Sequence, residues 1–141
     1  MRDTAFVVVL AAVLCVTFGM GWGIQMGISG DHTMAGAHAH LNLAGWATLA
    51  LFGVYYRLTP QAAQAWLARA HLAVALPGIA LMIGGLAWVF TGGPVGPAIA
   101  GSLLTAASML IFLFTVIRHG FGPRQAAGQG TAREMWLGTP A

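Results

Sequence analysis

Residues 5–28 read AFVVVLAAVLCVTFGMGWGIQMGI, a run without a single charged side chain. Because about 20 apolar residues in a helix span the hydrocarbon core of a bilayer, this run predicts a membrane-spanning helix. It is longer than the roughly 7–15-residue apolar core of a signal peptide, and no small-residue cleavage site follows it. We therefore expect residues 5–28 to be retained as the first helix.

Three further apolar runs occupy residues 34–56, 66–90 and 95–117. Turn-forming and polar residues separate the runs, and Pro77 inside the third is expected to kink it. Only 6% of the residues are charged, against about 25% in soluble domains. The sequence thus predicts an all-α membrane protein with a four-transmembrane-helix bundle over residues 1–118. Residues 119–141, rich in Gly, Gln and Pro, are expected to form a flexible cytoplasmic tail.

The positive charges indicate how the chain crosses the membrane. All of them are arginines, and they lie at the N-terminus, between the second and third runs, or in the tail: Arg2, Arg57, Arg69, Arg118, Arg124 and Arg133. Positively charged loops stay on the cytoplasmic side. We therefore expect a multi-pass protein of the inner (plasma) membrane with both termini cytoplasmic. The net charge of +3 then reflects topology, and we expect no nucleic-acid partner.

Composition excludes several functions. Cys15 is the only cysteine, so an internal disulfide, a Cys-x-x-Cys redox pair and covalent haem attachment through Cys-x-x-Cys-His are excluded. The chain has no lysine and only three carboxylate side chains. A Walker-type nucleotide loop is therefore absent, and a Ser-His-Asp hydrolase is unsupported.

Chemistry is concentrated in the second run, where residues 37–46 read AHAHLNLAGW. Intramembrane polar side chains are costly and indicate function by default, so we favour a ligand role for His38 and His40. Residues two apart on a helix point about 200° away from each other. The two imidazoles therefore cannot chelate one ion together, whereas His38 and Asn42 share a face. The alternative is that both histidines only hydrogen-bond carbonyls or lipid headgroups.

This stretch resembles the histidine helix of subunit I of the haem–copper oxidase superfamily, which includes cytochrome oxidases and nitric oxide reductases. The resemblance rests on His38-Ala39-His40-Leu41 followed by Gly45. It implies that His38 and His40 are axial ligands of haem iron, each serving a different haem. It also implies a haem b protein for electron transfer or for binding haem or a diatomic gas, with Asn42 beside the cofactor, and a possible oxidoreductase with a redox partner.

The resemblance covers residues 30–57 and leaves out other parts of that subunit. The family has about twelve helices in three arcs of four, a His-His copper pair and intramembrane proton-channel residues, whereas this chain has the equivalent of one arc. The resemblance therefore implies neither the usual oxygen or nitric oxide reduction nor proton pumping. It does imply a homo-oligomer, such as a trimer, in which second helices share haem. Glycines such as Gly19 and Gly23 are expected either to pack protomers or to contact porphyrin.

His71 is expected to lie apart from this stretch. It is two residues from Arg69 at the cytoplasmic edge, while His40 is about 25 Å up the second helix, so the vertical gap is on the order of 20 Å. His71 is therefore expected to be an interfacial histidine, and is less favoured as a metal ligand for a second haem. His32 and Asp31 are expected to be a solvated pair in the outer loop.

Two other functions remain open. Thioether and imidazole groups suit copper(I), and methionines cluster with histidines near the outer ends of the first two helices, so a copper-binding membrane protein is an alternative to haem. The other is a cofactor-free accessory subunit of a respiratory oxidase, which would be colourless when purified.

Overall fold

The structure, a computed structural model, describes residues 3–123. Every regular element in that part is a helix, and three helices, α1, α5 and α6, are long and apolar enough to cross a membrane. The chain is therefore an all-helical membrane protein. The elements are α1 (Thr4–Ser29), α2 (Ala35–His40), η1 (Leu41–Thr48), α3 (Leu49–Leu58), α4 (Pro60–Ala63), α5 (Trp66–Phe90) and α6 (Gly96–His119).

The second apolar run forms one continuous helix, but its geometry changes along its length. Residues 35–58 are helical without a break, and η1 within them is a π-helix. The Thr48 hydroxyl donates to the carbonyl of Leu43, five residues earlier, at 2.9 Å. We call α2, η1 and α3 together the composite helix. The sequence predicted its limits to within two residues, but not its π-helical middle.

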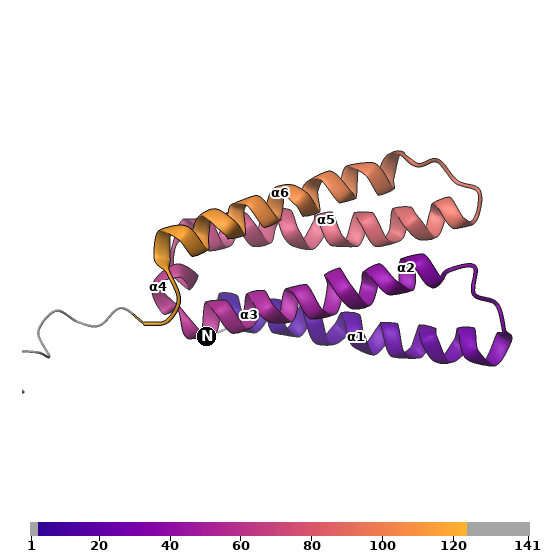
Figure 1. Ribbon diagram of the computed structural model, residues 1–141, viewed down its shortest axis with the longest axis horizontal. Coiled ribbons are helices and arrows are strands. Elements are labelled where there is room, and N and C mark those ends of the chain that lie inside the picture. Colours follow the sequence, from indigo (N-terminus) through magenta and orange to yellow (C-terminus); the bar gives the residue numbers. More distant parts are fainter. Residues whose placement is uncertain (1–2, 124–141) are drawn as a thin grey trace, which may run out of the picture.

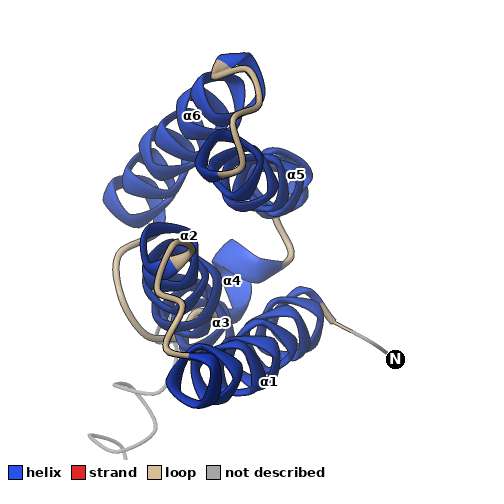
Figure 2. Ribbon diagram, turned by 90° about the vertical axis from the view of Figure 1, so that its right-hand side faces the viewer, coloured by secondary structure: helices blue, strands red, loops and turns tan. Residues whose placement is uncertain are grey.

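The helices form two antiparallel hairpins (Figures 1 and 2). In the first, α1 packs against the composite helix, and in the second α5 packs along α6. The connections 30–34 and 91–95 lie at one end of the molecule, which we call the loop end. The start of α1, α4 and the end of α6 lie at the other, which we call the α4 end (Figure 1). Most of the predicted tail, residues 124–141, lies outside the described residues.

Local sequence explains where α1 begins and ends. The Asp3 carboxylate accepts a hydrogen bond from the backbone N–H of Phe6 at 2.8 Å, which caps the first turn. Gly30 ends the helix with φ +69°, a left-handed conformation that glycine adopts without strain. In the second hairpin, α5 continues as a helix through Pro77.

Small residues allow α5 and α6 to approach closely. A Cβ added at Gly85 would overlap the backbone of Ala98, and one added at Gly101 would overlap the backbone of Met82. At Gly78 the added atom would lie 2.9 Å from the Leu104 Cβ. Close backbone approach at glycines is a common way for helices to associate in membranes, where burial of apolar surface supplies little driving force.

The two hairpins meet along α5, which contacts α2 and η1 as well as α4, and the buried core between them lies toward the α4 end. The core there contains Phe52, Tyr55 and Tyr56 of α3 and Ile79 of α5, all almost fully buried. Many large apolar side chains elsewhere point outward, including Phe18 (72% exposed) and Leu110 (67% exposed). An apolar outer surface is what a bilayer solvates, so the exposure pattern agrees with the length of the helices.

Candidate functional site

His38 and His40 lie on different faces of α2. His38 is half-buried and meets the indole of Trp22 on α1 edge to face, with ring centroids 6.3 Å apart. His40 is exposed on the outside of the hairpin. The helical period had predicted this divergence, and the structure confirms that the two imidazoles do not converge on a single point.

The orientation of His40 is fixed by its own helix. Its Nδ1 lies 2.8 Å from the carbonyl oxygen of Gly36, one turn earlier. A carbonyl oxygen only accepts hydrogen bonds, so in the neutral imidazole Nδ1 carries the proton and Nε2 keeps its lone pair. A backbone carbonyl on one ring nitrogen is the usual arrangement when the other nitrogen binds a metal.

Asn42 is the closest polar neighbour of His38. Its amide nitrogen donates to the His38 carbonyl oxygen at 2.9 Å, which confirms that the two residues share a face. The same nitrogen lies 3.4 Å from Nδ1 and 3.3 Å from Nε2 of the imidazole. Because it is nearly equidistant from both, it lies over the ring instead of in line with either lone pair. The amide thus supports the ring without occupying a nitrogen in its plane.

A notch in α1 receives these side chains. A Cβ added at Gly23 would lie 3.2 Å from Cε1 of His38, and one at Gly19 would lie 2.5 Å from Oδ1 of Asn42. Together with Met20 and Ile24, these residues line an open groove of about 440 Å³. Gly21 and Gly27, on the same helix, face open space. The glycines of α1 therefore have two different environments.

The π-helical segment is a feature that sequence reasoning did not predict. It begins at Leu41, directly after His40, and it brings Gly45 so close to α1 that an added Cβ would lie 2.9 Å from Sγ of Cys15. Single π-helical turns often occur at functional sites. Glycine at position 45 and the polar Asn42 and Thr48 are the only local signals in the sequence, and neither type is specific to a π-helix.

The prediction for His71 was wrong about its surroundings. The side chain is not at a solvated interface but completely buried, near the α4 end. Its Nδ1 lies 3.0 Å from the Tyr56 hydroxyl, and the rings of Phe52 and Phe112 pack on it. The sequence signal, proximity to Arg69, gave the level along α5 but could not give the face. Nε2 has no hydrogen-bond partner among the described residues.

The connection 30–34 at the loop end holds the remaining pair of interest. The Asp31 carboxylate accepts hydrogen bonds from the hydroxyl (2.6 Å) and the backbone N–H (2.9 Å) of Thr33, and these lower the pKa of Asp31. His32 is exposed, and its Nδ1 lies 3.0 Å from the Gly30 carbonyl oxygen. Among residues 3–123 no three His, Cys, Asp or Glu side chains are placed to hold one ion.

Comparison with protein families, curated proteins and solved structures found no match to this chain.

Proposed function

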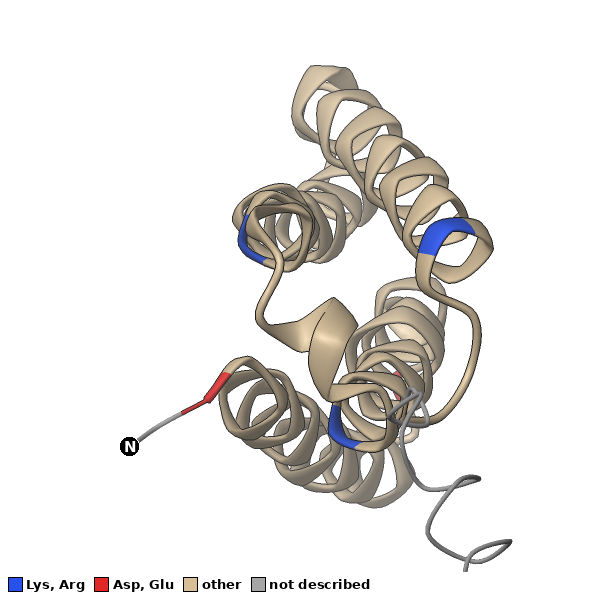
Figure 3. Cartoon of the chain, turned by 90° about the vertical axis from the view of Figure 1, so that its left-hand side faces the viewer, with Lys and Arg blue, Asp and Glu red and all other residues tan. Residues whose placement is uncertain are grey.

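We propose that the composite helix is a fourth membrane span. We also propose that the α4 end of the bundle faces the cytoplasm. Among the described residues the arginines lie at the α4 end, on α3, α5 and α6, and the loop end carries no Lys or Arg (Figure 3). Positive charge is retained on the cytoplasmic side of bacterial inner and plasma membranes. His38 and His40 then lie toward the outer surface.

We further propose that this chain is a membrane haem b protein with His40 and His38 as axial ligands. The observation that carries the proposal is the His40 imidazole, whose Nδ1 contacts the Gly36 carbonyl while its Nε2 has no hydrogen bond among residues 3–123. A porphyrin supplies four nitrogens to its iron and needs only one or two donors from the protein. Two imidazoles on opposite faces of one helix therefore suit two haems and do not suit a tetrahedral metal site.

Each residue of the site has a separate task in this proposal. His40 binds from the outer face of the hairpin, and His38 binds from the groove beside Gly23. Asn42 contacts the His38 ring, the notch at Gly19 and Gly23 lets both side chains lie against α1, and the open groove beside them gives a flat group room to approach. Bound haem would supply one-electron chemistry, or diatomic gas binding where an axial position stays open.

The exposure of His40 supports a homo-oligomer. A haem bound there would have protein on one side only, so a second wall and a second axial ligand would have to come from another protomer. The resemblance to one arc of a three-arc subunit favours a trimer with haem shared between composite helices. We propose electron transfer with a redox partner as the role of such an assembly.

Copper(I) is the second candidate. Met20 lines the same groove as His38, and a thioether with an imidazole suits copper(I). Met26, by contrast, is buried in packing, with 6% of its surface exposed. Fewer methionines are therefore available to bind copper(I) beside His38 than their clustering in the sequence indicated.

The test is the visible spectrum of the chain purified in mild detergent, recorded as reduced minus oxidised and combined with a pyridine haemochrome assay. We expect sharp reduced α and Soret bands. The mass of the coloured complex is expected to exceed that of one protomer. A monomer with bound haem would contradict the sharing of haem between protomers but not the binding of haem. A chain that stays colourless after haem is added would contradict the haem proposal, and copper(I) titration would follow.

A valine at Gly23 tests the groove beside His38. Since even a single Cβ there would lie 3.2 Å from the imidazole, we expect Gly23→Val to weaken haem binding at His38 by about tenfold or more, from the typical cost of overpacking. Gly27→Val is the matched control, because position 27 faces open space. Haem titration followed at the Soret band measures both variants, and equal effects would contradict a role for the groove.

A further inference from the structure

A second cavity lies at the α4 end, away from the histidines of α2. It measures about 510 Å³ and lies where the start of α1, the end of α3, α4 and the start of α5 come together. Its wall includes two arginines, one near the end of α3 and one near the start of α5. The lining residues are Asp3, Thr4, Tyr56, Arg57, Pro60, Ala63, Gln64 and Arg69.

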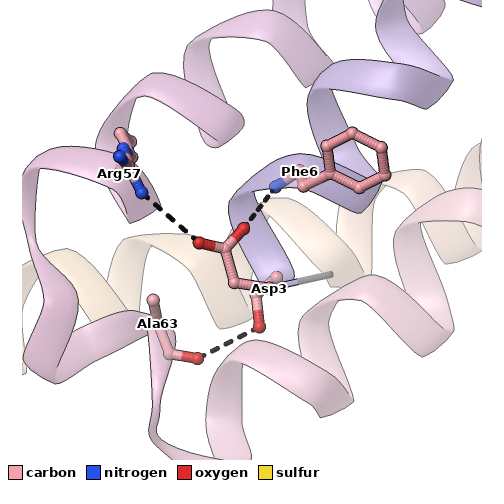
Figure 4. A network of polar contacts seen from close by, with 5 residues as sticks. Asp3, Phe6, Arg57 and Ala63 are labelled. Atoms are coloured by element: carbon pink, nitrogen blue, oxygen red, sulfur yellow. Dashed lines mark hydrogen bonds and ion pairs between the residues drawn. The ribbon is translucent and has the colours of Figure 1, made fainter. Parts of the chain in front are cut away.

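One of the two arginines is already partly neutralised. The Nη1 atom of Arg57 lies 3.5 Å from the Asp3 carboxylate, whose other oxygen caps α1 (Figure 4). Both side chains of this ion pair are largely exposed, so the pair is weak and easily rearranged. The Thr4 hydroxyl donates to the Ala63 carbonyl at 3.1 Å and ties α1 to the end of α4. One wall of the cavity is therefore linked by a hydrogen bond between α1 and α4, while the charged side chains remain accessible.

Arg69 has no such partner. Among residues 3–123 no hydrogen bond or ion pair involves its guanidinium group, and Asp3 is the only carboxylate on the cavity wall. Two positive groups therefore face one negative group, and the excess charge is on Arg69. The amide of Gln64 adds neutral hydrogen-bonding capacity at the same rim.

The level of the cavity in the membrane indicates its ligand. Trp66, three residues before Arg69, is 72% exposed at the start of α5, and exposed tryptophans at helix ends lie at the headgroup layer. Basic pockets between helices at this level bind the headgroups of anionic lipids. We propose that this cavity binds the phosphodiester group of an anionic phospholipid from the leaflet on that side, with Arg69 as the main contact and Arg57 as the second.

Native mass spectrometry of the detergent-purified chain tests the proposal by titration with phosphatidylglycerol and, separately, phosphatidylcholine. We expect retention of phosphatidylglycerol only, and we expect Arg69→Gln to weaken it about fivefold, which corresponds to about 1 kcal/mol per basic residue at a membrane surface. Arg118→Gln is the matched control, because Arg118 lies at the same end on α6 but does not line the cavity. We expect it to change retention by less than about twofold.

The alternatives give different results. Equal losses in the two variants would overturn the proposal, since the lipid would then respond to net charge and not to the cavity. Equal retention of phosphatidylcholine would overturn it as well. Inorganic phosphate that stabilises the chain against heat and displaces phosphatidylglycerol at low millimolar concentration would assign the cavity to a free anion. None of these results depends on haem, so they leave the proposal for His38 and His40 untouched.

Discussion

Replacing His40 with alanine is expected to remove the haem signal that depends on the exposed face of the composite helix. His40 offers a free Nε2 because its Nδ1 is held by the Gly36 carbonyl at 2.8 Å. Loss of the outer-shell partners of metal-binding histidines already lowers affinity by roughly 10–100-fold, and loss of the ligand itself should exceed that range. The measurement is bound haem per protomer, from the pyridine haemochrome assay and the reduced Soret band.

The matched control is His32→Ala. His32 is also exposed and also has Nδ1 near a backbone carbonyl, that of Gly30 at 3.0 Å, but it lies in the connection between α1 and α2. We expect this variant to keep its haem. Loss of haem in both variants to the same extent would mean that the signal comes from unspecific binding to surface histidines, and the assignment of His40 would be wrong.

His38→Ala separates the two proposed sites. If one helix serves two haems, this variant should lose the part of the spectrum that His40→Ala retains, and the double variant should be colourless. If either single variant loses all of the haem, both histidines serve one cofactor, and the two-haem arrangement implied by the resemblance does not hold. The folded state of each variant is checked by its helical circular dichroism.

An alanine at Gly85 is expected to open the hairpin of α5 and α6. The added methyl group would overlap the backbone of Ala98, which cannot move aside as a flexible side chain could. Overpacking of this kind costs about 1–3 kcal/mol, and here it acts on the seam along which α5 and α6 pack. Unfolding in mixed micelles at increasing dodecyl sulfate concentration, followed by circular dichroism, measures the loss.

The neighbouring Gly84→Ala is the control for this prediction. Position 84 is in the same helix, but an added Cβ meets nothing within 4 Å. Alanine favours a helix over glycine by about 1 kcal/mol, so this variant should unfold at an equal or higher dodecyl sulfate concentration. A similar loss of stability in both variants would show that the seam does not control the hairpin. Haem binding by Gly84→Ala should be unchanged, because His38 and His40 lie in the other hairpin.

Most of the element boundaries could be predicted from the sequence. The runs predicted at 5–28, 66–90 and 95–117 correspond to α1 (Thr4–Ser29), α5 (Trp66–Phe90) and α6 (Gly96–His119). Long apolar runs bounded by turn residues and helix caps carry this information locally, because each backbone group in a bilayer must be satisfied within its own helix. The short helix α4 was not predicted, since four residues carry no periodic signal.

The candidate site was only partly predictable. The opposite directions of His38 and His40 follow from the helical period alone, and the structure agrees. The contact of His38 with Gly23 depends on a residue of another helix, and so does the burial of His71 beside Tyr56. Hydropathy is nearly uniform around these helices, so no pattern in the sequence selects the face that turns inward.

The sequence by itself therefore determined that this chain is helical and membrane-embedded, where its helices begin and end, and that its paired histidines diverge. Only the tertiary structure decided that Gly19 and Gly23 form a notch beside His38, that η1 follows His40, and that Arg57 and Arg69 line one cavity. The physical reason is the sequence separation of the residues that interact. Helix formation and insertion depend on neighbouring residues, whereas the pairing of helices depends on the fit of small and large side chains that are far apart in the chain.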